Sequence, residues 1–132
     1  MSIATRAELA LTTIPATGAG YDTGVAAART LKGSGITGVL TFDDVVGQGL
    51  IAGLNAHGQK VPADVSVISC EQVPGIRGEP PLTTIPARLA DAGKIALSLL
   101  VDAFDTEGLT DARYVLAAHL VAGGTTGPVA GA

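Results

Sequence analysis

The chain has 132 residues, of which 47% are hydrophobic and 15% are charged, so it is long and apolar enough to bury the core of one compact domain. This balance excludes an intrinsically disordered chain. The net charge is −4 and the 8 Lys and Arg residues form no run, which argues against nucleic-acid binding by this chain alone.

The first part of the chain predicts a strand, a helix and a second strand. Residues 9–14 are apolar and β-branched, which favours a short strand. A helix is expected to begin after an N-cap residue, Asp22 or Thr23, and to run to about Lys32. Residues 36–42 contain no charge and predict a buried strand.

A second helix is expected over residues 45–57. Asp43 or Asp44 supplies its N-cap, and Gly58 ends it in the manner of a C-terminal glycine cap. Apolar and small side chains recur along this segment at helical spacing. Residues 65–70 form another continuous apolar run, which predicts a further buried strand.

The last part of the chain predicts a short extended segment over 82–85, a helix over 89–104, a strand over 113–122 and a frayed tail over 123–132. Apolar residues cover most of the circumference of this helix, so burial on more than one side is expected. One face of the helix carries Leu89, Gly93, Ala96, Leu100 and Ala103, and Ile95, Leu97 and Leu99 widen it.

The alternation of uncharged strands with helices predicts an α/β fold, in which helices cover both faces of a parallel sheet. In such sheets ligands bind beyond the carboxyl ends of the strands. Asp43 and Asp44 follow one predicted strand, and Glu71 follows the next. We therefore expect these three residues around one crevice.

Each of these acidic residues has two interpretations. Asp43 and Asp44 can accept hydrogen bonds from the hydroxyl groups of a small polar ligand such as a sugar. Alternatively, a carboxylate at the start of a helix caps free N–H groups and interacts with the helix dipole. Glu71 is either a ligand-binding residue or a solvated loop residue.

Two glycine patterns leave alternatives open. Gly18, Gly20 and Gly24 lie between a predicted strand and a predicted helix, but their spacing is one residue too long for the dinucleotide-binding pattern G-x-G-x-x-G. A nucleotide-dependent enzyme stays an alternative on this pattern and is testable by NAD titration. Gly49 and Gly53 lie one helical turn apart and allow another backbone to approach, either within the chain or across a dimer.

No residue pattern supports catalysis, a cofactor or a metal site. His57 and His119 are isolated, and no Ser-His-Asp order, nucleophile elbow or phosphate loop occurs. The single cysteine, Cys70, excludes an internal disulfide and is interpreted as a small apolar residue at a strand end. The first residues do not resemble a signal peptide and no apolar run approaches about 18 residues, so a cytoplasmic protein with no membrane partner is expected.

Three stretches of the chain carry a specific resemblance to a known family. They are residues 39–49 (VLTFDDVVGQG), 61–68 (VPADVSVI) and 80–85 (PPLTTI). Together they resemble the LacI/GalR family of bacterial transcription regulators, and the resemblance covers the chain from Gly24 onward. Periplasmic sugar-binding proteins share the fold but usually lack the second and third stretches.

The resemblance implies an incomplete periplasmic-binding-protein-like type I core, mostly one of two lobes with an effector between them. Residues 1–86 would form most of the C-terminal lobe, and residues 87–111 a helix packed on the absent N-terminal lobe. Residues 112–122 would be a return strand and 123–132 a flexible tail. Operator DNA would be contacted only through a helix-turn-helix that this chain lacks.

The resemblance also implies roles for particular residues. Asp43 and Glu71 hold the positions that tend to face the effector in relatives, and Ala19 holds the position of an aromatic residue that often caps it. Asp44 would cap the helix or support the pocket. The dimer surface of the family falls on Val46, Gly49, Leu50, Gly53, Pro81 and Leu82.

The sequence is therefore interpreted as the effector-sensing and dimerisation part of a bacterial repressor. The expected effector is a sugar or a similar small polar molecule that alters the DNA affinity of the intact homodimer. Two alternatives stay open, namely a solute-binding protein for transport and an inactive truncated fragment. Weak or no effector binding is expected of this chain alone, because half of the cleft would be absent.

Overall fold

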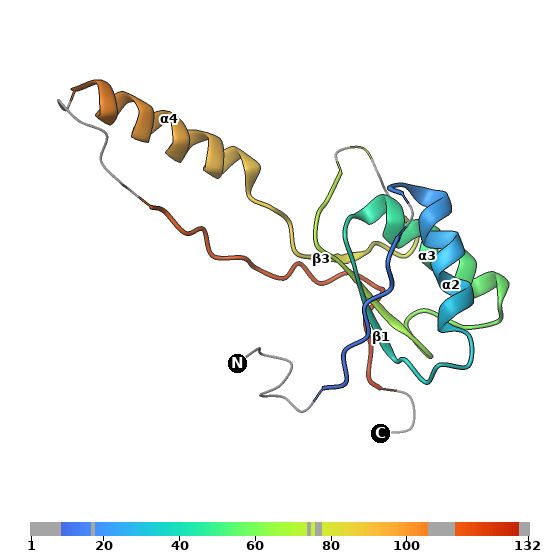
Figure 1. Cartoon of the computed structure of the whole chain (residues 1–132). Helices are drawn as coiled ribbons and strands as arrows, with labels where there is room; N and C mark the ends of the chain where they lie inside the picture. The colour runs from blue at the N-terminus through green and yellow to red at the C-terminus, as the bar shows by residue number, and fades with distance from the viewer. Residues whose placement is uncertain (1–8, 17, 74, 76–77, 106–112, 130–132) are drawn as a thin grey trace.

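The computed structural model describes residues 9–16, 18–73, 75, 78–105 and 113–129 (Figure 1). In chain order the elements are α2 (Tyr21–Leu31), β1 (Gly38–Thr41), α3 (Asp44–Ala56), β2 (Ser66–Ser69), β3 (Thr83–Thr84) and α4 (Leu89–Asp105). Each of these six elements lies within two residues of a predicted segment, so these six predictions are confirmed.

The three strands form one sheet in the order β1-β2-β3, and both pairings are parallel as predicted. Gly38 pairs with Ser66 and Thr41 pairs with Ser69, so β1 and β2 begin and end in step. Helices α2 and α3 lie together on one face of the sheet (Figure 1). Successive side chains of a strand point to opposite faces. The predicted cover on both faces is wrong for the described residues, because Leu40 in β1 is 61% exposed.

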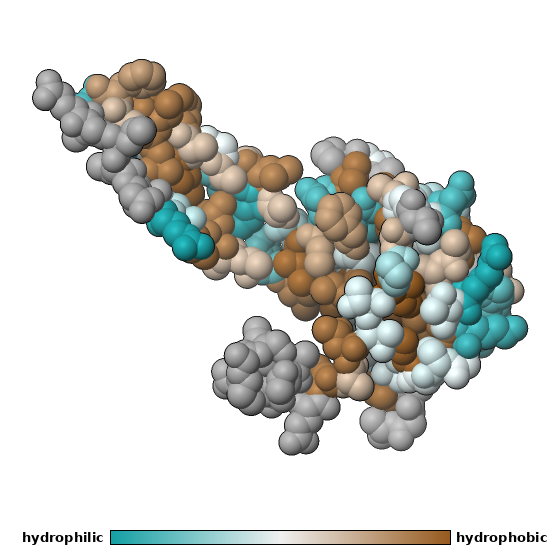
Figure 2. Space-filling view, in the orientation of Figure 1, coloured by the Kyte–Doolittle hydropathy of each residue, from teal (hydrophilic) through white to brown (hydrophobic). Residues whose placement is uncertain are grey.

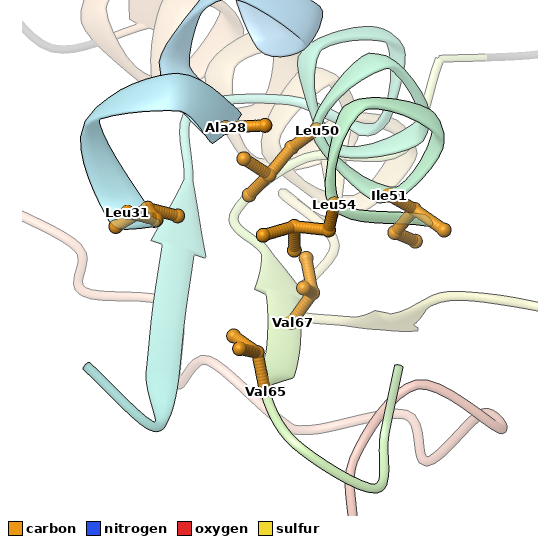
Figure 3. Close-up of a cluster of buried hydrophobic side chains, with 7 residues drawn as sticks. All are labelled: Ala28, Leu31, Leu50, Ile51, Leu54, Val65 and Val67. Atoms are coloured by element: carbon orange, nitrogen blue, oxygen red, sulfur yellow. The ribbon is translucent and has the colours of Figure 1, made fainter. Parts of the chain in front are cut away.

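The hydrophobic core lies between this sheet and the two helices. Every buried side chain in it is Ala, Val, Leu or Ile, and burying each of the larger ones contributes about 1.5–3 kcal/mol. Figure 3 shows the cluster, formed by Ala28 and Leu31 from α2, by Leu50, Ile51 and Leu54 from α3, and by Val65 and Val67 at β2. Helix α3 supplies the most side chains to this cluster.

Glycines allow α2 and α3 to pack backbone against backbone. A Cβ atom at Gly24 would overlap the carbonyl oxygen of Val46, and a Cβ atom at Gly49 would overlap the carbonyl oxygen of Tyr21. A Cβ atom at Gly53 would lie 2.6 Å from the Cβ atom of Ala28 and 2.9 Å from the carbonyl oxygen of Val25, both in α2. The close approach that Gly49 and Gly53 predict is therefore a contact within the chain.

Helix α2 begins differently from the prediction. Its N-cap position is Gly20, whose φ is 116°, and no side chain forms a capping hydrogen bond there. This φ lies in the region that favours glycine. The prediction of Asp22 or Thr23 as the cap is therefore wrong, and Asp22 instead lies in the first turn, where its charge interacts favourably with the helix dipole.

Two predicted strands are wrong. Residues 9–14 lie outside any strand, and Leu9 and Leu11 are 67% and 80% exposed. Residues 113–120 likewise lie outside any strand, and Val121 forms only an isolated antiparallel bridge with Thr84. A β-branched run becomes a strand only where a neighbouring strand offers its N–H and C=O groups.

The frayed tail predicted over residues 123–132 is wrong for residues 123–127, which hydrogen-bond to the sheet and to the segment before β3. Thr125 is fully buried, and its hydroxyl donates to the carbonyl of Val67 over 2.7 Å and accepts from the N–H of Thr83 over 2.9 Å. The N–H of Val67 in turn donates to the carbonyl of Thr125 over 2.8 Å. Strand β3 pairs only with Ile68 and Ser69, so Thr125 satisfies the N–H and the carbonyl of Val67 in β2. Residues 130–132 lie outside the described part of the chain.

Helix α4 leads away from the sheet (Figure 1), and none of its residues is buried. Figure 2 shows that hydrophobic residues dominate the visible surface of α4. The burial predicted for the helix on more than one side is thus absent within the described chain. Exposure of 50–81% is found for Leu89, Leu97, Leu100, Val101 and Phe104.

Candidate functional site

Two of the predicted effector-binding residues lie at one edge of the sheet. Strand β1 ends at Thr41 and β2 ends at Ser69, and these two residues pair in register. Asp43 and Glu71 each follow two residues later, so both leave the sheet at its carboxyl edge. The predicted common edge is confirmed, whereas the effector-binding role of the two residues stays a prediction.

The backbone of each acidic residue is held by a hydroxyl two positions earlier. The side chain of Thr41 donates to the carbonyl of Asp43 over 3.0 Å, and the side chain of Ser69 donates to the carbonyl of Glu71 over 2.6 Å. Both hydroxyl-bearing residues are buried. Sequence reasoning missed Thr41 and Ser69, although the repeated pattern of hydroxyl, any residue, acid at both strand ends is a signal that could have found them.

Asp43 is the N-cap of α3. Its backbone is extended, with φ of −140° and ψ of 174°, and its Oδ1 accepts from the N–H of Val46 over 2.8 Å. The cap role assigned to Asp44 is therefore wrong, because Asp44 is already the first helical residue. The structure resolves the choice between the two neighbours in favour of the residue that precedes the helix.

The residues next to these acids are exposed to solvent. Phe42, between Thr41 and Asp43, is 75% exposed. Cys70, between Ser69 and Glu71, is also exposed, so the small apolar residue expected at this strand end lies on the surface and not in the core. Ala19 is exposed in the loop before α2.

Asp44 is placed far deeper than Asp43. It is 2% exposed, and its Oδ2 accepts from the N–H of Val73 over 3.0 Å. Its Oδ1 is buried and has no hydrogen-bond partner among the described residues. Asp44 thereby fastens the first turn of α3 to the segment that follows β2, and its predicted role in pocket support stays a prediction.

Asp44 also lines a cavity of about 330 Å³ between the start of α3 and the segment that leads into β3. Sequence reasoning missed its other polar residues, because no local pattern links them. Neither Asp43 nor Glu71 is among the described residues that line it. The cavity therefore does not coincide with the predicted crevice. Its lining includes Gln48, Gln72, Glu79, Pro81 and Leu82.

Three of the six residues predicted at a dimer surface are buried inside the chain. Leu50 is 2% exposed in the core, and Gly49 and Gly53 are covered by α2. Their assignment to a dimer surface is therefore wrong, since a residue enclosed by its own chain has no surface left to offer. Pro81 is exposed, and Val46 and Leu82 are half-buried, so a dimer role for these three stays a prediction.

The remaining polar candidates fit structural roles. His57 is the C-cap of α3, and its N–H donates to the carbonyl of Gly53 over 3.2 Å. Within the described ranges, no group of three or more His, Cys, Asp or Glu residues is arranged to hold a metal ion. In the same part of the chain, no helix has the length and hydropathy needed to cross a membrane.

Residues 2–126 match a protein family described as the periplasmic binding protein-like domain. The chain is 33% identical over 104 residues to the HTH-type transcriptional regulator CelR of Thermobifida fusca, covering 76% of this chain and 31% of the relative. A LacI family transcriptional regulator from Arthrobacter, solved in complex with lactose, matches at 26% identity with a TM-score of 0.79, over 94% of this chain and 47% of that one. A complex of CelR with cellobiose matches at 28% identity with a TM-score of 0.77, over 92% and 39%.

These matches confirm the predicted fold and the resemblance to LacI-type regulators. The matching domain covers nearly the whole chain, and the relatives are named as transcription regulators. They favour a regulator over the transport alternative, and none of the relatives just described is named as an enzyme. The chain spans about a third of the length of the curated relatives it matches.

Proposed function

We propose that this chain, which belongs to the periplasmic binding protein-like domain family, is the effector-sensing part of a LacI-type transcription regulator. The observation that carries the proposal is the shared carboxyl edge of β1 and β2, where Asp43 and Glu71 follow register-matched strand ends. Ligands of parallel α/β sheets bind at such edges. The regulators solved with lactose and with cellobiose support a sugar, or a similarly small polar molecule, as the effector.

The two acids would contribute different atoms. The cap bond of Asp43 uses Oδ1, so we assign its other carboxylate oxygen to an effector hydroxyl. Glu71 is half-buried, and its longer side chain reaches the effector from the neighbouring strand end. Hydrogen bonds from a neutral hydroxyl to a carboxylate contribute about 1.5–3 kcal/mol each. Ala19 leaves space on the side of the effector that faces the loop before α2.

In this proposal the effector binds one arrangement of two lobes more tightly than another, and this difference alters DNA affinity. The apolar surface of α4 is exposed in this chain, and an apolar helix surface of this kind is normally buried. This exposure supports a second lobe that packs against α4 and buries it. Operator DNA would be bound by a helix-turn-helix outside this chain, in keeping with the net charge of −4 found here. The intact protein would act in the cytoplasm as a homodimer, with Pro81 at the dimer surface.

The proposal is tested by calorimetric titration of the intact regulator with a panel of mono- and disaccharides. Glu71→Ala and Asp43→Ser should each weaken binding about tenfold or more, since each removes a charge-assisted hydrogen bond. Serine is chosen because it caps a helix as well as aspartate does, so the fold is kept while the carboxylate is lost. Asp22→Asn, which removes an acid from the first turn of α2, is the matched control. Unchanged affinity in both site variants would reject the two residues.

Cys70 provides a second measurement that needs no substitution in the site. It is the only cysteine of the chain, it is exposed, and it lies directly before Glu71. A bound sugar at this edge should slow alkylation of the Cys70 thiol by iodoacetamide in the intact regulator. Protection should disappear in Glu71→Ala. Identical alkylation rates with and without a saturating sugar would place the effector elsewhere.

A further inference from the structure

The cavity lined by Asp44 is a second candidate site, separate from the edge that carries Asp43 and Glu71. Its volume of about 330 Å³ lies at the lower end of the range for small-molecule sites, which is roughly 300–1,000 Å³. None of Asp43, Glu71 and Ala19 is among its described lining residues. A ligand there would therefore not need the predicted effector-binding residues.

One carboxylate oxygen of Asp44 has no partner in the part of the chain that the structure describes. The residue is 2% exposed, Oδ2 accepts from the N–H of Val73, and Oδ1 is buried with no hydrogen bond to any described residue. A buried polar atom left without a partner costs about 1–3 kcal/mol, and more when the group is charged. Native proteins satisfy such atoms with water, an ion or a ligand. The Oδ1 atom therefore indicates a hydrogen-bond donor that completes the site.

The chemistry of the other lining residues fits a donor with positive charge. Glu79 adds a second carboxylate, and Gln48 and Gln72 can present amide oxygens. No Lys or Arg is among the described residues that line the cavity, so no basic residue among them neutralises the two carboxylates. Leu82, packed partly against the core, forms an apolar wall beside them.

The size of the cavity and its ligand set favour an organic cation over a bare metal ion. Among the described residues, no three His, Cys, Asp or Glu side chains gather to hold a metal, and 330 Å³ far exceeds the volume of one ion. We propose that the cavity binds a small organic cation whose primary ammonium group donates to Oδ1 of Asp44. Glu79 and Leu82 accommodate the rest of the molecule. Because Oδ1 is shielded from solvent, entry includes a rotamer change of the lining side chains.

Calorimetric titration of the 132-residue chain with putrescine tests this proposal, since putrescine carries an ammonium group at each end. Butanediol has the same carbon chain with hydroxyl ends and serves as the neutral probe. Saturable binding of putrescine and none of butanediol is expected. Asp44→Asn keeps the shape and should weaken putrescine binding about tenfold or more, whereas Glu79→Gln should weaken it about threefold. Asp22→Asn removes an equivalent first-turn carboxylate outside the cavity and should leave the affinity unchanged.

Several outcomes would overturn the proposal. Absence of saturable binding up to about 10 mM putrescine would mean that Oδ1 holds an ordered water only. Equal binding of butanediol, or displacement of putrescine by equimolar Mg²⁺, would assign the cavity to a neutral ligand or to a metal. If Asp44→Asn does not fold, Glu79→Gln decides, because Glu79 is exposed and its substitution leaves the core intact. The sugar titrations depend on different residues, so either result stands without the other.

Discussion

Replacing Gly49 by alanine should destabilise the chain, although alanine normally stabilises the interior of a helix. Intrinsic propensity favours alanine over glycine by about 1 kcal/mol. At Gly49, however, the new Cβ atom would overlap the carbonyl oxygen of Tyr21 and lie 2.8 Å from its carbonyl carbon. These are backbone atoms of α2, so no side-chain rotation relieves the contact. The two helices must separate instead.

The magnitude follows from two opposing terms. Overpacking a well-packed site costs about 1–3 kcal/mol, and a contact with backbone places Gly49 at the upper end. Subtracting the gain of about 1 kcal/mol in helix propensity leaves a net loss of about 2 kcal/mol in the free energy of unfolding. For a domain of this size such a loss lowers Tm by about 8 °C.

Urea unfolding followed by far-UV circular dichroism measures this loss of stability. Alanine substitutions at two further glycines, which have more space around them, serve as comparisons. A Cβ atom at Gly47 would lie 3.1 Å from Oγ1 of Thr41 and 3.3 Å from Cδ1 of Leu82, which are side-chain atoms, so Gly47→Ala should cost less than Gly49→Ala. At Gly93 in α4, none of the described atoms lies within 4 Å of the Cβ position, so Gly93→Ala should raise helicity and leave the unfolding midpoint of the core unchanged. A Gly49→Ala chain as stable as the wild type would refute the helix contact.

Three further predictions concern other elements. Thr125→Val leaves the carbonyl of Val67 without its hydroxyl donor and the N–H of Thr83 without its acceptor. Urea titrations should show a free energy of unfolding lower by about 3 kcal/mol. The loss should be clearly larger than in the control Thr126→Val, which removes one hydroxyl contact. Asp43→Ala should cost about 1 kcal/mol through the lost cap, and differential scanning calorimetry should find most of it restored in Asp43→Ser. Sedimentation velocity should detect concentration-dependent self-association of this chain through the exposed α4, reduced by a double Leu97→Glu, Phe104→Glu substitution, with no change in the unfolding midpoint.

The central elements could be predicted because their patterns are local. The uncharged runs around β1 and β2 fit strands that are paired on both sides or covered by helices, and the spacing of Leu50 and Leu54 marks the face of α3 that enters the core. The run Leu9–Ile14 has a similar composition and yet forms no strand. Composition reports how well a segment would fit a sheet, and it does not report whether a partner strand is adjacent.

Features that depend on distant residues could not be predicted. Thr125 binds to Val67 and Thr83 across 58 and 42 residues, and a Gly-Gly-Thr-Thr-Gly sequence predicts a loose tail when those partners are unknown. Gly49 indicates a close backbone approach, but the identity of the approaching backbone requires the position of α2. The cavity beside Asp44 has the same origin, because its polar residues come from α3 and from the segment after β2.

The start of α3 shows why two adjacent acids have different surroundings. Asp43 precedes the helix in an extended conformation, so its side chain stays at the carboxyl edge and caps the Val46 N–H. Asp44 is the first residue of the helix, and its carboxylate is buried, where it accepts from the N–H of Val73 and lines the cavity. Substituting both acids at once would therefore disturb two sites, and only single variants can assign a loss of sugar binding or of cation binding to its residue.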